Sequence, residues 1–158
     1  MLYVFPALLV IALVAIQFGA LSGSRPTDIG VRQSRLKPPS PTPNSVSSQA
    51  ALYADHPQRD YAEIKPLPLK GGGATSSLQA LEGVLHAMPG IEVIERRPDY
   101  LYAQAQTRWL KFVDDLEFWV NPVSGVIELR SASRLGRRDY GMNRQRVEAI
   151  RAAYLALP

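Results

Sequence analysis

The chain opens on a long apolar stretch. Residues 2–21 contain no charged side chain, and only Pro6, Gln17 and Gly19 interrupt the apolar pattern. A helix of about twenty residues is enough to cross the ~30 Å hydrocarbon layer of a bilayer. A cleaved signal peptide is the alternative, but no Lys or Arg precedes the stretch and the cleavage signal near Ala20 is weak. We therefore predict a transmembrane anchor over residues 1–22.

The next segment, residues 23–60, has no apolar period. It is rich in Pro and Ser, with prolines at 38, 39, 41 and 43. Closely spaced prolines favour extended chain and prevent a helix. We predict an extended segment here, followed by a compact domain over residues 61–158.

Within the predicted domain, the apolar positions alternate between strand and helix periods. Strands are expected at about 64–69, 91–96, 100–106, 112–120 and 126–133. One helical stripe joins Leu78, Leu81, Leu85 and Met88, and another joins Val147, Ile150, Tyr154 and Leu157. The order β-α-β-β-β-β-α predicts an α+β fold, with an antiparallel sheet of four to five strands and two helices on one face.

The register of the last two strands follows from their apolar rows. Placing Phe118 opposite Leu129 makes the core-facing row self-consistent. Glu117 then lies opposite Arg130 on the other face, as an outward ion pair. On the core-facing row, Asp114 lies opposite Ser133, and Ser131 precedes it. One end of that row is therefore polar.

A carboxylate on a core-facing row needs partners, because unpaired burial costs several kcal/mol. Arg134, Arg144 and Arg146 are the nearest cations in the sequence. The last two fall in the first turn of the final predicted helix, beside the candidate cap Asn143, where the helix dipole disfavours positive charge. We therefore expect a negative group to be held there.

Several interpretations of this cluster remain open. In one, the protein's own carboxylates clamp the arginines, and structural ion pairs involve Asp115, Glu117, Arg130 and Asp139. In another, an external anion binds, with ligand candidates Asp114, Ser131, Ser133, Arg134, Asn143, Arg144 and Arg146. A hydrolase using Asp114 or Ser131 lacks an evident base, since both histidines lie elsewhere in the sequence.

A metal site is disfavoured because adjacent aspartates point to opposite faces of a strand. No metal, cofactor or catalytic residue is predicted. The 158 residues suffice for one domain, and the net charge of +4 is spread too evenly to suggest nucleic-acid binding. The absence of cysteine excludes disulfides and thiolate metal sites.

Three motifs carry a family resemblance: residues 43–49 (PNSVSSQ), residues 112–118 (FVDDLEF), and residues 130–136 (RSASRLG) continued by 139–148 (DYGMNRQRVE). They resemble domain-of-unknown-function family 1499, an uncharacterised bacterial family whose members are often membrane-anchored. The resemblance implies that the Pro-rich segment through Gln49 is part of the domain. It implies no activity.

Together these features predict a single-pass protein of the bacterial inner membrane, with the side of the membrane left open. Its domain is expected to be non-catalytic and to bind a ligand or partner, such as an anionic small molecule or a lipid headgroup. A purely structural domain is the alternative.

Overall fold

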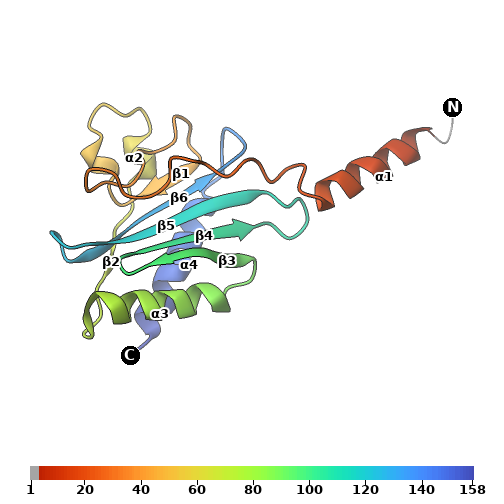
Figure 1. The fold of residues 1–158 in the computed structure, drawn as a ribbon. Helices are drawn as coiled ribbons and strands as arrows, with labels where there is room; N and C mark the ends of the chain where they lie inside the picture. Colours follow the sequence, from red (N-terminus) through yellow and green to blue (C-terminus); the bar gives the residue numbers. More distant parts are fainter. Residues whose placement is uncertain (1–3) are drawn as a thin grey trace.

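The computed structural model describes residues 4–158 and has an α+β fold (Figure 1). Its antiparallel sheet has the strand order β1-β6-β5-β4-β3, and β2 also pairs with β6. The strands are β1 (Ser45–Ser47), β2 (Leu67–Pro68), β3 (Ile91–Arg97), β4 (Tyr100–Gln106), β5 (Val113–Asn121) and β6 (Val126–Ser133). The α-helices are α1 (Val4–Gln17), α2 (Arg59–Ala62), α3 (Gly73–Ala87) and α4 (Met142–Ala156), and η1 (Ala50–Leu52) is a 3-10 turn. The predicted α+β class is confirmed, but the sheet has six strands rather than four to five.

The predicted register of β5 and β6 is confirmed. Phe118 pairs with Leu129, Glu117 with Arg130, and Asp114 with Ser133. A shift by one residue would have moved every apolar side chain of the hairpin to the other face, and this penalty explains why the pattern alone fixed the pairing.

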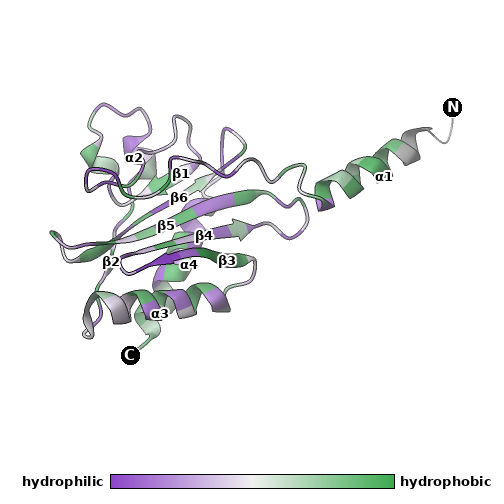
Figure 2. Ribbon diagram, in the orientation of Figure 1, coloured by the Kyte–Doolittle hydropathy of each residue, from purple (hydrophilic) through white to green (hydrophobic). Residues whose placement is uncertain are grey.

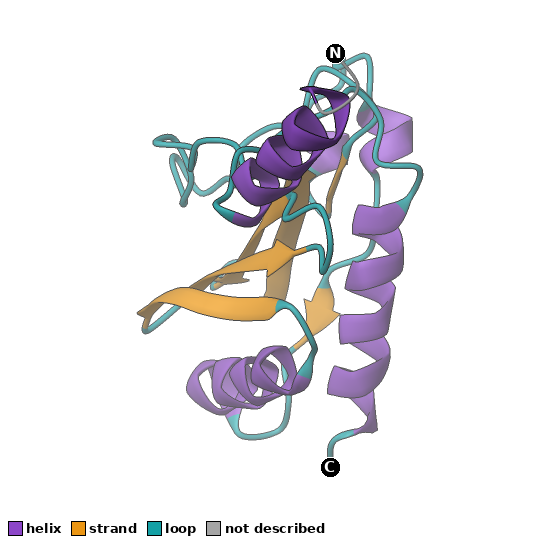
Figure 3. Cartoon of the chain, turned by 90° about the vertical axis from the view of Figure 1, so that its right-hand side faces the viewer, coloured by secondary structure: helices purple, strands orange, loops and turns teal. Residues whose placement is uncertain are grey.

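Helices α3 and α4 cover one face of the sheet (Figure 3). Leu81 and Leu85 of α3 and Ile150 of α4 pack against the even-numbered side chains of β5, including Leu116 and Phe118. This is the main hydrophobic core. Helix α3 begins at Gly73 and ends at Ala87.

The opposite face of the sheet is covered as well, which the sequence did not predict. Residues 23–38, here called the strap, run across this face (Figure 1). Leu36 of the strap packs with Tyr100, Tyr102 and Trp119 in a second, smaller core. The prediction that Glu117 and Arg130 point outward is therefore wrong, because the strap buries both.

The remainder of the Pro-rich segment also contributes structure. Strand β1 pairs with β6 from Ser45↔Ala132 to Ser47↔Arg130. Val46 of this strand joins the main core. A strand of three residues is too short to show an alternating pattern in the sequence. Only the family resemblance implied that this segment is part of the domain.

The N-terminal apolar helix is shorter than predicted. Helix α1 ends at Gln17 and has 14 residues, so it is about 21 Å long. Figure 2 shows hydrophobic colouring along much of this helix, which projects away from the sheet. Among residues 4–158, no helix is both long and apolar enough to cross a membrane. The predicted transmembrane helix over residues 1–22 is thus not found, and residues 1–3 of that range lie outside the described part.

Candidate functional site

An ion pair joins the start of α4 to the sheet. Arg146 Nη2 lies 2.6 Å from Asp114 Oδ2, and both side chains are largely buried. Arg146 Nη1 also donates to Asn143 Oδ1 at 2.9 Å. The core-facing carboxylate predicted on β5 therefore has a partner within the protein.

Asn143 connects the polar end of the β5–β6 hairpin to the β1 segment. Its Oδ1 accepts from Ser131 Oγ, and its Nδ2 donates to Ser133 Oγ at 3.0 Å and to the Asn44 carbonyl at 3.1 Å. Asn143 is fully buried and lies inside the first turn of α4, so it is not the helix cap that the sequence suggested. Both candidate serines are engaged by this one amide.

The N-cap residue of α4 is Gly141, and the Asp139 side chain rather than that of Asn143 accepts the amides at the helix start. Its Oδ1 accepts from the Gly141 amide at 3.0 Å, and its Oδ2 accepts from the Asn143 amide at 3.1 Å. The Tyr61 hydroxyl donates to the same carboxylate. Burial acts to raise the pKa of Asp139, but the bonds from Tyr61, Gly141 and Asn143 outweigh it and leave the pKa below the ordinary value. The negative group expected at this helix start is thus Asp139 itself.

Of the two arginines predicted at the start of α4, Arg144 forms no ion pair with a carboxylate within residues 4–158. Its Nη2 donates to the Tyr61 carbonyl at 2.6 Å. With Tyr61 and Arg138 it lines a small cavity of about 190 Å³.

Arg134 lies on the other face of the sheet and does not join this cluster. Its Nη2 and Nε bind Asp115 at 2.7 and 3.0 Å. The Tyr102 hydroxyl donates to the same carboxylate at 2.6 Å, and Arg134 Nη1 reaches the Gly23 carbonyl of the strap. The seven ligand candidates are therefore divided between two faces, six on the helix face and Arg134 beneath the strap.

The Glu117–Arg130 pair is the most deeply buried ionic group in the described part of the chain, with 0% of Glu117 and 4% of Arg130 exposed. Glu117 Oε1 accepts from the Gly30 amide at 2.6 Å and from the Tyr100 hydroxyl at 2.8 Å. Its Oε2 lies 3.8 Å from Arg130 Nη1 and has no hydrogen-bond partner within residues 4–158. Burial raises the pKa of Glu117, and the Gly30 amide, Arg130 and Tyr100 only partly offset this effect.

Sequence reasoning missed the strap residues that complete this pair. The Gly30 amide and the Pro38 carbonyl, which accepts from Arg130 Nε at 3.2 Å, are backbone groups. A backbone donor or acceptor in an irregular segment leaves no side-chain pattern. The contact of the Tyr100 hydroxyl with Glu117 likewise left no signal in the sequence.

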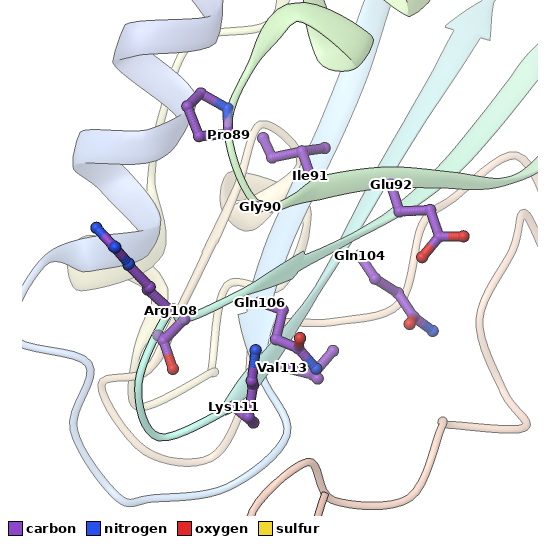
Figure 4. Close-up of a pocket in the computed structure, with 10 residues that line it drawn as sticks. Pro89, Gly90, Ile91, Glu92, Gln104, Gln106, Arg108, Lys111 and Val113 are labelled. Atoms are coloured by element: carbon purple, nitrogen blue, oxygen red, sulfur yellow. The ribbon is translucent and has the colours of Figure 1, made fainter. Parts of the chain in front are cut away.

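A larger cavity opens where the edge strands pass the end of α3. It measures about 470 Å³ and has a mixed polar lining. Figure 4 shows Glu92 and Gln104 beside each other on β3 and β4, with Gln106 and Lys111 farther along. The Gln106 amide donates to the Gly90 carbonyl at 2.7 Å, which fixes the strand end that forms this wall.

No catalytic constellation is assembled from the described residues. His56 accepts from the Gln58 amide, and His86 lies 4.0 Å from Glu82, so the recorded contacts of both histidines are away from Ser131 and Asp114. Within residues 4–158, no group of three or more His, Asp or Glu side chains could hold a metal ion. The geometry offers binding surfaces and internal ion pairs.

A family described as "Protein of unknown function (DUF1499)" matches residues 35–154. The match covers the whole sheet, α3, most of α4 and the last four residues of the strap. No curated protein and no solved structure matches the chain. Because the match spans well over half of the sequence, the chain belongs to the DUF1499 family.

Proposed function

We propose that this protein is a non-catalytic binding domain that works at a lipid surface, with α1 and the β4–β5 loop (residues 107–111) as its contacts. The exposure of α1 is the first support. From Leu8 to Val14, its Leu, Val and Ile side chains are 48–63% exposed. Apolar side chains exposed around a whole helix favour an apolar environment over water.

The β4–β5 loop has the composition of a membrane-interface segment. Trp109 is 72% exposed and Leu110 is 47% exposed. Arg108 and Lys111 flank them. Trp is favoured at the headgroup level, and cations near the surface add about 1 kcal/mol each on anionic lipid.

One contact carries the proposal. Gln17 Nε2, at the end of α1, donates to the Trp109 carbonyl at 3.1 Å. This bond brings the helix and the loop to the same end of the domain, next to the exposed Phe18. Two exposed apolar segments far apart in the sequence thus lie at one end of the domain, with Arg108 and Lys111 beside them.

A helix of this length suits insertion into the interface, where an amphipathic or apolar segment lies at the boundary of headgroups and acyl chains. The proposed location is therefore still the bacterial inner membrane, but the protein attaches to its surface through anionic lipid instead of spanning it.

A purely structural domain is the second candidate, and the Asp114–Arg146 pair favours it. The charges that suggested an anion site at α4 are met by Asp114 and Asp139. This candidate accounts for the helix-face cluster but leaves the exposed Trp109 unexplained.

Lipid vesicles test the membrane proposal. The full chain, purified in mild detergent, is diluted into vesicles containing about one quarter anionic lipid, and flotation measures binding. In vesicles with brominated acyl chains, bromine quenches the fluorescence of tryptophans that contact the lipid. The quenching should come from Trp109, because Trp119 is buried in the second core. We expect the protein to float and its tryptophan emission to be quenched.

The variant Trp109→Phe tests whether Trp109 is the tryptophan that the lipid quenches, and Val123→Ser is the control. Val123 is exposed in the β5–β6 turn, at the other end of β5. Trp109→Phe should abolish the quenching, whereas Val123→Ser should leave it unchanged. Failure to float would refute the lipid-surface function. Flotation without quenching would restrict the contact to α1 and refute the role of the loop.

A further inference from the structure

The strap encloses a cavity on the face of the sheet opposite α3 and α4. It measures about 250 Å³ and is lined by strap residues 28–38 together with Tyr53. Its rim is a tight hairpin, in which Arg32 and Arg35 pair across a turn formed by Gln33 and Ser34 at positive φ. The volume is appropriate to a small molecule rather than a peptide.

The lining of this cavity is rich in cations. Arg32, Arg35 and Lys37 all line it, whereas Asp28 is its one carboxylate. Lys37 binds Asp28 at 2.6 Å. No carboxylate within residues 4–158 lies in salt-bridge range of Arg32 or Arg35, so these two cavity-lining guanidinium groups have no counterion in the described part of the chain.

A third guanidinium lies directly behind the cavity wall. Arg130 is almost fully buried, and its one recorded hydrogen bond within the described residues runs from Nε to the carbonyl of Pro38, a wall residue. Its Nη1 is 3.8 Å from Glu117 Oε2, which is beyond hydrogen-bond distance. No acceptor within residues 4–158 is recorded for the two terminal nitrogens of Arg130, and neither nitrogen is among the fully buried atoms without a partner, so both are open to water or to a ligand.

Arg130 does not itself line the cavity, and its bond to the Pro38 carbonyl places it behind the wall. Burial raises the pKa of the Tyr53 hydroxyl, and the charges of Arg35 and Arg130 both oppose that rise. Tyr53 itself lines the cavity, and its hydroxyl donates to the Leu36 carbonyl at 2.7 Å. The rim arginine and the buried arginine therefore act on the same side chain.

We propose that the strap cavity is a binding site for a small phosphate-bearing molecule, held by Arg32 and Arg35 at the rim above the buried Arg130. Counting Arg32, Arg35, Lys37 and Arg130 against Asp28 and Glu117 leaves an excess of two positive charges. A phosphate monoester carries nearly two negative charges at neutral pH, and arginine pairs bind it through two parallel hydrogen bonds. This site is separate from the lipid contact and does not depend on it.

Calorimetric titration of the full chain in detergent with inorganic phosphate tests the site, at constant ionic strength. Arg35→Gln and Arg32→Gln should each weaken phosphate binding by about tenfold, the effect of losing a charge-assisted bond. Arg137→Gln is the matched control, because Arg137 is exposed in the loop before α4 and lies outside the cavity. It should bind phosphate like the wild type. Acetate should bind at least tenfold more weakly than phosphate.

Arg130→Lys provides a second measurement. It keeps the buried charge but cannot form the same bonds, so phosphate should raise its melting temperature less than that of the wild type. If this variant fails to fold, the rim variants still decide the question. Unchanged binding in Arg35→Gln, equal weakening in Arg137→Gln, or acetate binding as tight as phosphate would each overturn the proposal.

Discussion

Arg146 of α4 binds Asp114 of β5 through Nη2 and Oδ2 at 2.6 Å. Arg146 is the fifth residue of α4 and lies near the helix N-terminus, where the dipole disfavours positive charge. Asp114 offsets that cost and would itself be an uncompensated carboxylate without Arg146. The pair therefore makes the start of α4 and the polar end of the hairpin depend on each other.

Removing one member of this pair should destabilise the fold. Arg146→Gln leaves Asp114 buried without its cation, and we expect a loss of about 2–4 kcal/mol in the free energy of unfolding. Urea denaturation at neutral pH measures it. Arg144→Gln, two residues away, removes only a bond to the Tyr61 carbonyl and should cost about 1 kcal/mol. Equal losses in the two variants would contradict a specific role for the Asp114 contact.

Asp139 should contribute stability that depends on pH. Its folded pKa is lowered, so the contribution is fully present above the unfolded value near 3.8 and is lost as pH falls through the folded pKa. Asp139→Asn should lower stability by about 1–2 kcal/mol at neutral pH, through the weakened cap. The difference between wild type and variant should shrink on acidification. Thermal melts between pH 2 and 7 would reveal it, and a constant difference would exclude the ionic contribution.

Glu117 should show the opposite dependence. Burial raises its folded pKa above the unfolded value near 4.5, so its ionisation equilibrium favours the fold at low pH. That contribution declines as pH rises from the unfolded pKa through the folded one. Relative to Glu117→Gln, the wild type should therefore lose stability over this range. The same melts measure it, and a gain with rising pH would show that Arg130 outweighs burial.

Gly90 should tolerate no side chain. Its φ is +75°, and an added Cβ would lie 2.7 Å from the Gln106 carbonyl oxygen. Gly90→Ala should cost about 1–3 kcal/mol. In contrast, a Cβ at Gly83 in α3 would meet nothing within 4 Å, and Gly83→Ala should add about 0.5–1 kcal/mol by helix propensity. Chemical denaturation compares the two. A neutral Gly90→Ala would imply that the β4 end shifts freely.

The success of the sequence predictions varied with how local the interactions are. The β5–β6 register, the strands β3 and β4 and the apolar stripe of α4 from Val147 to Tyr154 follow from side-chain periods within each segment, and these predictions were confirmed. Leu157, predicted in the same stripe, lies beyond the helix and is exposed. Caps depend on loop geometry: Gly141 rather than Asn143 is the N-cap residue of α4, and the Asp139 side chain accepts the Asn143 amide. The predicted spanning helix was wrong because an apolar composition does not fix where a helix ends, and α1 stops at Gln17.

The sequence by itself determined which residues share a face of the sheet, because alternation along a strand is a property of the backbone. It placed Asp114 on one side and Glu117 on the other. Only the tertiary structure decided that both sides are buried. The strap reaches Glu117 through the Gly30 amide, 87 residues away in the chain, and packs Leu36 onto Tyr100 and Trp119. A segment without secondary structure has no period, so the surface that it covers is defined only when the chain folds back onto the sheet.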